Sequence, residues 1–474
     1  MRKTRIICTI GPSTNEVEIM KNLIEAGMNV ARFNFSHGTH ETHRDIANKI
    51  KKASLELNAP IALMLDTKGP EIRTKSLKEE AVTLQEGSSF ILTIKDIVGD
   101  ETIASVTHQG LPKDVQAGGK ILIDDGLIEL LINEVTETDV ICTVINSGIL
   151  KANKGINLPD FDVSLPSLTE KDINDIKFAI YEGFHFVAAS FIRSASDVVQ
   201  IRNVLNQNGG SHIKIISKIE NHQGVDKIDE IIEASDAIMV ARGDLGVEIS
   251  PEEVPLVQKN LIRKCNRAGK PVITATQMLE SMITKPRPTR AETNDVANAI
   301  FDGTDAIMLS GETASGKYPI EAVTTMARIA TKIEESIEYN KIFKNKSEEV
   351  LSPTDTIAYA ASTIARDIKA NSILALTASG FTANMISKFR PNVQIFTITP
   401  NENVYRQNSL VWGSVPILAK KIKDPKELMI HSLEVAEQNG YIKKGDTIVI
   451  VSGMPVGVSG TTNSIRVHIV GQQV

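Results

Sequence analysis

Short apolar runs alternate with longer amphipathic stretches along most of the chain. Stretches such as 16–26, 252–268 and 289–300 have helical spacing, and Gly27 and Gly269 follow two of them as stop signals. Eight units of strand and helix are the number that closes a parallel (β/α)8 TIM barrel. An open doubly wound sheet can also hold eight strands, but the regular alternation favours closure. The expected strands are 5–11, 29–36, 61–67, 184–192, 214–220, 236–244, 271–278 and 305–312.

The alternation is interrupted after the third expected strand. Residues 70–166 are rich in turns and in short β segments, at 89–94, 120–123 and 140–144, with glycines between them. We therefore expect an inserted all-β domain that can act as a lid over a site at the end of the barrel.

The pattern changes again near residue 344. A helix at 354–368 and strands at 372–377, 393–398 and 446–451 indicate an open α/β domain. The predicted organisation is a barrel from 1–69 and 167–343, a lid from 70–166 and a C-terminal domain from 344–474, with the charged stretch 344–349 as the linker.

Composition excludes several functional classes. The chain has 474 residues, enough for more than one core, and a net charge of −6, which gives no basic footprint for nucleic acid. No apolar run approaches the length of a membrane span, and no signal-peptide core precedes the first strand. Cys8, Cys142 and Cys265 are widely spaced, which fits free thiols in a reducing compartment. We expect a cytoplasmic protein.

Charged residues end two strands that are otherwise apolar. Lys218 and Glu220 lie two residues apart and so share a face of strand 214–220, and Asp244 ends strand 236–244. Buried charges are costly unless each finds a partner. A hard divalent cation held by two carboxylates beside an ammonium group meets that condition and suits phosphate or enolate chemistry. Ordinary ion pairs at strand ends are the alternative interpretation.

Polar residues recur at the carboxyl ends of most expected strands, which is where barrel enzymes build their active sites. Each one alone could be a helix cap or a surface residue. Their repetition at one rim indicates a site. They are Arg32, Asn34, Ser36, His37, Asp66, Thr67, Lys68, Thr274, Thr276, Ser310 and Glu312, in addition to the three charged residues above.

Seven motifs carry a specific resemblance to the pyruvate kinase family, in order and over essentially the whole chain. No phosphotransfer-type domain is expected after Val474, unlike in some bacterial members. The motifs are Ile7-Cys-Thr-Ile-Gly-Pro-Ser13, Ala31-Arg-Phe-Asn-Phe-Ser-His-Gly38, Asp66-Thr-Lys-Gly-Pro-Glu-Ile-Arg73, Ile215-Ile-Ser-Lys-Ile-Glu-Asn221, Ala241-Arg-Gly-Asp-Leu-Gly246, Ala275-Thr-Gln-Met-Leu-Glu-Ser281 and Leu309-Ser-Gly-Glu-Thr-Ala314.

The resemblance implies transfer of the phosphoryl group of phosphoenolpyruvate to ADP, giving ATP and pyruvate in the last step of glycolysis. Glu220 and Asp244 would hold Mg²⁺ or Mn²⁺, while Lys218 and Arg32 would stabilise the transferring group. The turn at Gly243 would offer backbone N–H groups to the substrate carboxylate. Thr276 would lie beside that carboxylate. The proton donor to the enolate is not assigned.

The resemblance also implies a K⁺ site formed by Asn34, Ser36, Asp66 and Thr67. Members that need K⁺ carry glutamate at the position of Glu71, whereas K⁺-independent members carry lysine, whose ammonium group can replace the charge of the ion. Glu71 therefore predicts activation by K⁺. A simple ion pair between Glu71 and Arg73 or a nearby lysine is the alternative.

Nucleotide and effector sites follow from the same resemblance. Arg73 and Lys154 match phosphate-binding positions at the lid hinges, with Asn34 and His37 nearby. The loop 377–382, which precedes an expected helix at 383–389, and the loop 453–461 match the binding site of a phosphorylated activator. The effector-binding residues that the resemblance implies in the first loop are Thr377, Ser379, Gly380 and Thr382. The family usually forms homotetramers.

Two other functions and one decoy stay open at this point. A Mg²⁺-dependent lyase could use the same carboxylates, but it would need no second phosphate site at Arg73 and Lys154. A catalytically silent sensor could use the C-terminal loop alone. Residues 311–317 resemble a Walker A loop, but Tyr318 occupies the position where that motif requires a serine or threonine to bind Mg²⁺. A turn at the barrel rim explains these residues better.

Overall fold

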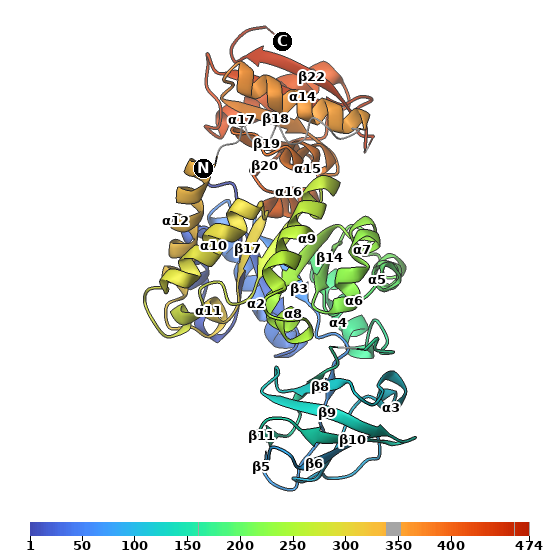
Figure 1. Ribbon diagram of the computed structural model, residues 1–474. Coiled ribbons are helices and arrows are strands. Elements are labelled where there is room, and N and C mark those ends of the chain that lie inside the picture. The colour runs from blue at the N-terminus through green and yellow to red at the C-terminus, as the bar shows by residue number, and fades with distance from the viewer. Residues whose placement is uncertain (160, 338–351, 459, 474) are drawn as a thin grey trace.

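The computed structural model describes residues 1–159, 161–337, 352–458 and 460–473. Figure 1 shows a barrel in the middle, a β domain at one end and an α/β domain at the other. The predicted linker 344–349 and the boundary at 343/344 lie outside the described residues. The domain limits given above therefore stay predictions.

Eight parallel strands close into a barrel, which confirms the predicted (β/α)8 fold. Their order around the barrel is β1-β17-β16-β15-β14-β13-β3-β2. Most strands end earlier than the apolar pattern predicts, because loops or short helices take over at their carboxyl ends. The strands are β1 (Arg5–Thr9), β2 (Val30–Asn34), β3 (Ala62–Asp66), β13 (Phe186–Ala189), β14 (Lys214–Ile219), β15 (Ala237–Ala241), β16 (Val272–Ala275) and β17 (Ala306–Leu309).

Alternating side chains divide the barrel core in two. One set, including Met64, Ala188 and Ile216, fills the barrel interior, and the other packs under the surrounding helices. The helices are α1 (Val17–Ala26), α2 (His40–Glu56), α4 (Glu170–Tyr181), α5 (Ala195–Gln207), α6 (His222–Asp226), α7 (Ile228–Ala234), α8 (Arg242–Glu248), α9 (Val254–Ala268), α10 (Arg290–Asp302), α11 (Gly311–Ala314) and α12 (Pro319–Ser336), with 3-10 turns η1 (Pro12–Thr14) and η2 (Glu280–Ile283).

The inserted segment folds as a β domain with its own apolar core. Its sheet has the order β4-β12-β8-β9-β10-β6-β7, and β11 pairs with β5. One helical turn, α3 (Leu111–Asp114), interrupts the expected all-β pattern. The strands are β4 (Ile72–Arg73), β5 (Ala81–Leu84), β6 (Ser89–Thr93), β7 (Ile103–Ser105), β8 (Lys120–Ile123), β9 (Ile128–Val135), β10 (Asp139–Val144), β11 (Gly148–Lys151) and β12 (Gly155–Asn157).

The C-terminal domain is an open sheet of order β20-β19-β18-β21-β22, in which β22 alone runs antiparallel to its neighbour. The sequence pattern missed β20 and β22. The elements are α14 (Pro353–Asp367), β18 (Ser372–Leu376), α15 (Phe381–Lys388), β19 (Gln394–Thr399), α16 (Glu402–Gln407), η3 (Asn408–Leu410), β20 (Ser414–Leu418), α17 (Pro425–Gln438), β21 (Thr447–Gly453) and β22 (Thr462–Ile469). None of the described helices combines the length and apolar character of a membrane span.

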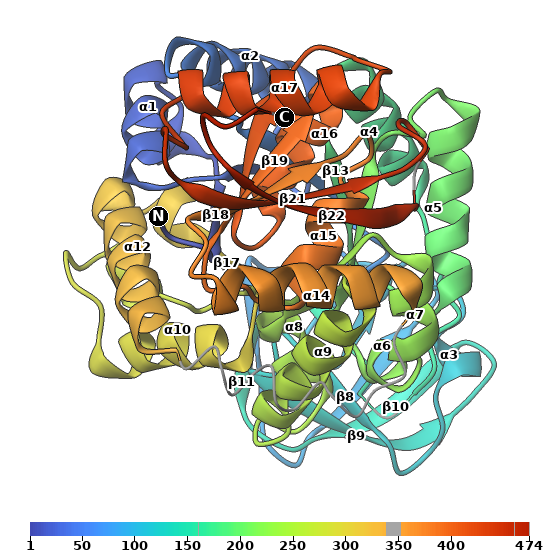
Figure 2. The same ribbon diagram turned by 90° about the horizontal axis from the view of Figure 1, so that it is seen from above.

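The C-terminal domain covers the amino end of the barrel (Figure 2). Leu410 belongs to the cluster that fills the barrel interior. The Arg5 guanidinium, which is buried at the start of β1, donates to the carbonyls of Val411 and Ser414. This leaves the carboxyl end of the barrel facing the lid, and positions the site between them.

His185, just before β13, makes stability depend on pH. Its Nδ1 accepts from the Leu63 N–H at 2.9 Å, and burial lowers the pKa of the ring from 6.5 to about 3. Below about pH 6.5 the imidazole of His185 binds a proton in the unfolded chain but stays neutral in the folded chain. The free energy of unfolding therefore falls as the pH drops from 6.5 towards 3. His185→Asn keeps an acceptor but cannot titrate. Thermal midpoints at pH 7.5 and pH 5 should therefore differ less in this variant; an equal difference in both proteins would contradict the assignment.

Candidate active site

Five polar side chains meet inside the carboxyl end of the barrel. On β14, Ile216 faces the interior, so Lys218 and Glu220, two and four residues later, face it as well. The same alternation directs Asp66 inwards above Met64, and Ser190 above Ala188. Arg32 enters this group from β2. The structure thus brings together residues from four different strands.

Lys218 lies at the centre of this group and is buried. Its Nζ donates to Ser190 Oγ at 2.7 Å and lies 2.8 Å from Glu220 Oε1 and 3.2 Å from Asp66 Oδ1. Burial by itself lowers the pKa of a lysine, but the charges of Asp66, Glu220 and Asp244 outweigh it, and the net effect raises the pKa of Lys218. The ammonium group therefore stays charged at neutral pH.

Arg32 is held by Asp66. Its Nε donates to Asp66 Oδ2 at 2.6 Å, and its Nη1 donates to Thr9 Oγ1 at 2.8 Å. Burial opposes ionisation of Asp66, but the nearby charges of Arg32 and Lys218 lower its pKa below the usual range. Asp66 thus fixes both cations in one orientation while it remains ionised.

Glu220 is almost fully buried and only partly satisfied. Its Oε2 accepts from the Phe191 N–H at 2.6 Å. Its Oε1 touches the Lys218 ammonium at 2.8 Å, yet no hydrogen bond of good geometry reaches this atom within the described residues. Burial and the neighbouring charge of Asp244, against the opposing effect of Lys218, raise the pKa of Glu220 to about 7. A further cation next to Oε1 would relieve this cost.

Asp244 and Gly243 differ from the sequence prediction. Strand β15 ends at Ala241, so both residues lie within helix α8 and not at a strand end or in a turn before a helix. Asp244 is partly exposed, and its charge acts on Lys218 and Glu220. The Gly243 N–H donates to Thr276 Oγ1 at 2.7 Å. A substrate carboxylate would have to replace that hydroxyl to use this N–H group.

Thr276 follows β16 in a strained turn. It has φ of 69°, and the next residue, Gln277, has φ of 53°. Arg242 supports this turn, because its guanidinium donates to the carbonyl oxygens of Ala275 and Thr276 and pairs with Asp295. The strain places the Thr276 hydroxyl beside α8.

Two residues predicted at the rim have structural roles. Thr274 faces away from the barrel interior, is fully buried and donates to Thr304 Oγ1 at 3.0 Å. Glu312 lies in α11, and its carboxylate accepts from the N–H groups of Leu279 and Ser310 at 3.0 and 2.8 Å. Thr274 lies inside β16 but on the face opposite to Ile273 and Ala275, whereas Glu312 lies beyond the end of β17, where the chain has already turned into α11.

The predicted K⁺ ligands lie at the ends of β2 and β3 or just beyond them. Asn34 pairs in register with Asp66, and its Oδ1 accepts from the Ser36 N–H at 3.1 Å. Thr67 Oγ1 accepts from the Ser190 N–H at 3.1 Å. Glu71 forms a salt bridge of 2.6 Å with Arg73. The alternative pairing considered for Glu71 is therefore present in the structure.

A cavity of about 310 Å³ separates the lid from the barrel. Its walls include Arg73 and Lys154 from the lid side and Asp244 from the barrel. Lys154 Nζ lies 2.8 Å from Asp124 Oδ1. The pKa of Asp125 is raised by burial and by the charges of Asp244 and Asp124, so the lid carboxylates face those of the barrel. Asn34 and His37, predicted near the nucleotide, are not among the residues that line this cavity.

Sequence reasoning missed three groups of the site. Ser190 accepts from Lys218, the Phe191 N–H binds Glu220, and Thr9 binds Arg32. Ser190 could have been found, since it lies two residues beyond Ala188 on the interior face of β13. The Phe191 contribution comes from the backbone and leaves no signal in the sequence.

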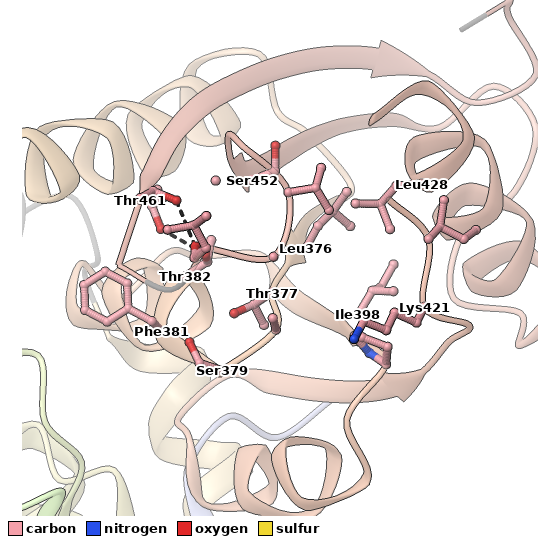
Figure 3. A pocket seen from close by; sticks show the side chains of 18 of the residues that line it. Leu376, Thr377, Ser379, Phe381, Thr382, Ile398, Lys421, Leu428, Ser452 and Thr461 are labelled. Atoms are coloured by element: carbon pink, nitrogen blue, oxygen red, sulfur yellow. Dashed lines mark hydrogen bonds between the residues drawn. The ribbon is translucent and has the colours of Figure 1, made fainter. Parts of the chain in front are cut away.

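A second cavity, of about 250 Å³, lies in the C-terminal domain. Figure 3 shows Thr377, Ser379 and Thr382 along one part of its wall, and Lys421 in another beside Ile398. Helix α15 begins at Phe381, two residues before the prediction, so Thr382 is helical and Gly380, with φ of 84°, is the N-cap. Thr382 Oγ1 lies 2.9 Å from Thr462 Oγ1, and the Gly380 N–H donates to Thr377 Oγ1 at 3.0 Å.

Comparisons with known proteins agree with this architecture. Residues 1–323 match the model for the pyruvate kinase barrel domain, and residues 355–468 match that for its alpha/beta domain. The chain is 50% identical to pyruvate kinase of Clostridium acetobutylicum over 99% of this chain and 100% of the relative. It is 51% identical to the Sporosarcina psychrophila enzyme, over 99% of this chain and 81% of that one. A crystal structure of pyruvate kinase from Cryptosporidium parvum superposes with a TM-score of 0.94 at 40% identity, covering 99% and 96% of the two chains.

Fold and site together define a phosphotransferase built on a (β/α)8 barrel with an inserted lid. The chain belongs to the pyruvate kinase family. Its substrates are phosphoenolpyruvate and ADP, and its products are pyruvate and ATP.

Proposed function

We propose that Glu220 and Asp244 hold the divalent cation, Mg²⁺ or Mn²⁺, on which the phosphoryl transfer depends. The observation that supports this proposal is the buried Glu220 Oε1, which lies 2.8 Å from the Lys218 ammonium, receives no well-directed hydrogen bond from the described part of the chain, and is influenced by the charge of Asp244. The site holds three carboxylates, those of Asp66, Glu220 and Asp244. They outnumber the two cationic side chains, Lys218 and Arg32, so negative charge is left for a metal ion to neutralise. Bound Mg²⁺ would neutralise charge on the phosphoryl oxygens.

Lys218 and Arg32 are the proposed stabilisers of the transferring group. Both are anchored by Asp66, so their charges are already oriented before substrate arrives. Groups that need no reorganisation stabilise developing charge most effectively. Thr276 and the Gly243 N–H, joined by a hydrogen bond, are proposed to receive the substrate carboxylate on the neighbouring side.

For the nucleotide we propose Arg73 and Lys154, which line the cavity between lid and barrel, together with Asn34 and His37 from the barrel rim. Lys154 is now paired with Asp124, and Arg73 with Glu71. Nucleotide phosphates would compete for both cations. Movement of the lid would bring Arg73 and Lys154 towards Asn34 and His37 and exclude water from the phosphates.

We further propose K⁺ bound by oxygen atoms of Asn34, Ser36, Asp66 and Thr67, with Glu71 setting the requirement. Glu71→Lys should reduce the dependence of the rate on K⁺, because the new ammonium group can supply the missing positive charge. Initial rates measured with and without K⁺ test this. Glu80→Lys, which changes an exposed lid glutamate in the same way, serves as the control. Unchanged K⁺ dependence in Glu71→Lys would remove Glu71 from the account.

The C-terminal cavity is the proposed site of a phosphorylated activator, either a sugar phosphate or a nucleotide. Thr377, Ser379, Gly380 and Thr382 surround the start of α15, and Lys420, Lys421 and Lys423 supply positive charge to the cavity wall. Binding is allosteric only if it changes the affinity for substrate, which is seen as a change in KM for phosphoenolpyruvate. The homotetramer and the cytoplasmic location stay predictions.

A coupled assay tests the function as a whole. Phosphoenolpyruvate, ADP and Mg²⁺ should give pyruvate and ATP in equal amounts, faster with K⁺ than without. Pyruvate formed without ATP would indicate a lyase, and no turnover would indicate a protein that only senses metabolites.

A further inference from the structure

The segment 190–194, between β13 and α5, touches the first hinge of the lid. The chain leaves the barrel for the lid at Gly69, whose φ of 72° suits glycine. A Cβ atom on Gly69 would lie 2.8 Å from Ser190 Cβ and 2.9 Å from Phe191 Cδ2. The first hinge therefore packs directly against this segment, with no room for a side chain between them.

The same segment holds the second hinge, where the chain returns from the lid at residues 163–167. The Arg193 guanidinium donates from Nη1 to the Val163 carbonyl at 2.8 Å and from Nη2 to the Leu165 carbonyl at 2.6 Å. The backbone of Arg193 is also held in place, because its N–H group donates to Asp197 Oδ2 at 2.9 Å. Asp197 also accepts from the hydroxyl of Ser167 in the returning chain.

The opposite end of the segment touches the site. Ser190 Oγ accepts from Lys218 at 2.7 Å, and the Phe191 N–H donates to Glu220 Oε2 at 2.6 Å. Phe191 makes this bond with φ of 56°, a conformation that costs energy for a residue with a side chain. Such a backbone is maintained only by its surroundings, and Arg193 lies two residues away.

We propose that Arg193 is a positioning residue that couples the orientation of the lid to the carboxylate of Glu220. If the returning hinge moves, Arg193 moves with it and shifts the Phe191 N–H that orients Glu220. By linkage, a cation bound at Glu220 must then favour one orientation of the lid. The inference rests on the proposed role of Glu220 in binding the cation.

Hydrogen exchange at residues 163–167, measured with and without Mn²⁺, tests the coupling together with Mn²⁺ affinity. In the unaltered enzyme Mn²⁺ should change exchange in this hinge. In Arg193→Met, which loses both hydrogen bonds to the hinge, exchange should be faster and should no longer respond to Mn²⁺. The Mn²⁺ dissociation constant should rise about tenfold, a coupling of ordinary size, and KM for ADP should rise more than kcat falls.

Two further variants separate coupling from stability. Arg193→Lys keeps one donor for one carbonyl and should restore part of the response. Arg202→Met also removes two guanidinium contacts on helix α5, away from the lid: one from Nη1 to the Ile213 carbonyl at 2.8 Å and one from Nη2 to the Asp236 carboxylate. It should leave the Mn²⁺ response intact. If Arg193→Met does not fold, the lysine variant carries the test, with a weakened response expected.

The outcomes distinguish the two proposals. A hinge that responds fully to Mn²⁺ in Arg193→Met would overturn the coupling and leave the metal site standing. Failure of the unaltered enzyme to bind Mn²⁺ through Glu220 would overturn the metal site, and the coupling with it.

Discussion

Lys218→Met should lower kcat by on the order of 10³ or more while the protein stays folded. Among the described residues, the Lys218 ammonium is the cation that contacts both Asp66 and Glu220, and its raised pKa keeps it charged at neutral pH. Methionine fills similar space but cannot stabilise charge on the phosphoryl group or the enolate. Steady-state kinetics with phosphoenolpyruvate and ADP measure the loss, and Mn²⁺ binding should remain near normal.

Lys270→Met is the matched control for this variant. Lys270 is also substantially buried, but it donates to carbonyl oxygens of Ile232, Glu233 and Ser235, at the amino end of the barrel. Its loss should cost stability and leave kcat nearly unchanged. If Lys218→Met instead keeps most of its rate, the role given to Lys218 is wrong.

Glu220→Gln should raise the Mg²⁺ concentration needed for half-maximal rate by at least about 100-fold, since even partners outside the metal shell are worth 10–100-fold. The amide can still accept from the Phe191 N–H, so the local fold is kept while one charge is lost. Mg²⁺ titration of the initial rate, with direct Mn²⁺ binding beside it, measures the effect.

Glu248→Gln provides the comparison for this change. Glu248 lines the cavity between lid and barrel, the pKa of its carboxylate is also raised by burial, and its Oε1 accepts from Asn157 at 2.7 Å. Because an amide can make the same bond, this variant should keep the normal Mg²⁺ requirement. Equal requirements in both variants would remove Glu220 from the metal site.

The barrel could be predicted from sequence because its strands are buried on both sides and read as apolar runs. The ends of those strands could not. The predicted strand 236–244 includes Arg242 and Gly243, but the structure ends β15 at Ala241 and places both residues in α8. Where the chain turns from strand to helix, period-two spacing no longer says which side of the barrel a residue faces, as Glu312 in α11 shows.

The meeting of Lys218, Glu220 and Asp66 at one end of the barrel could be predicted, because a charged residue in an apolar run needs a partner. Phe191 could not be predicted in this way, and the only sequence signal for Ser190 is its place two residues after the interior residue Ala188. A serine at a strand end and a backbone N–H carry no such cost, and their roles depend on how β13 lies beside β3 and β14. The hydrogen bonds from Arg193 to hinge carbonyls are likewise a tertiary feature with no local pattern.

The most direct test of the central claim is a crystal structure with Mn²⁺ and a non-reactive analogue of phosphoenolpyruvate. The account predicts one strong anomalous peak bonded to Glu220 and Asp244, with the phosphoryl-like group of the analogue between that peak and the ammonium of Lys218. A peak elsewhere, or an analogue bound away from Lys218, would contradict it.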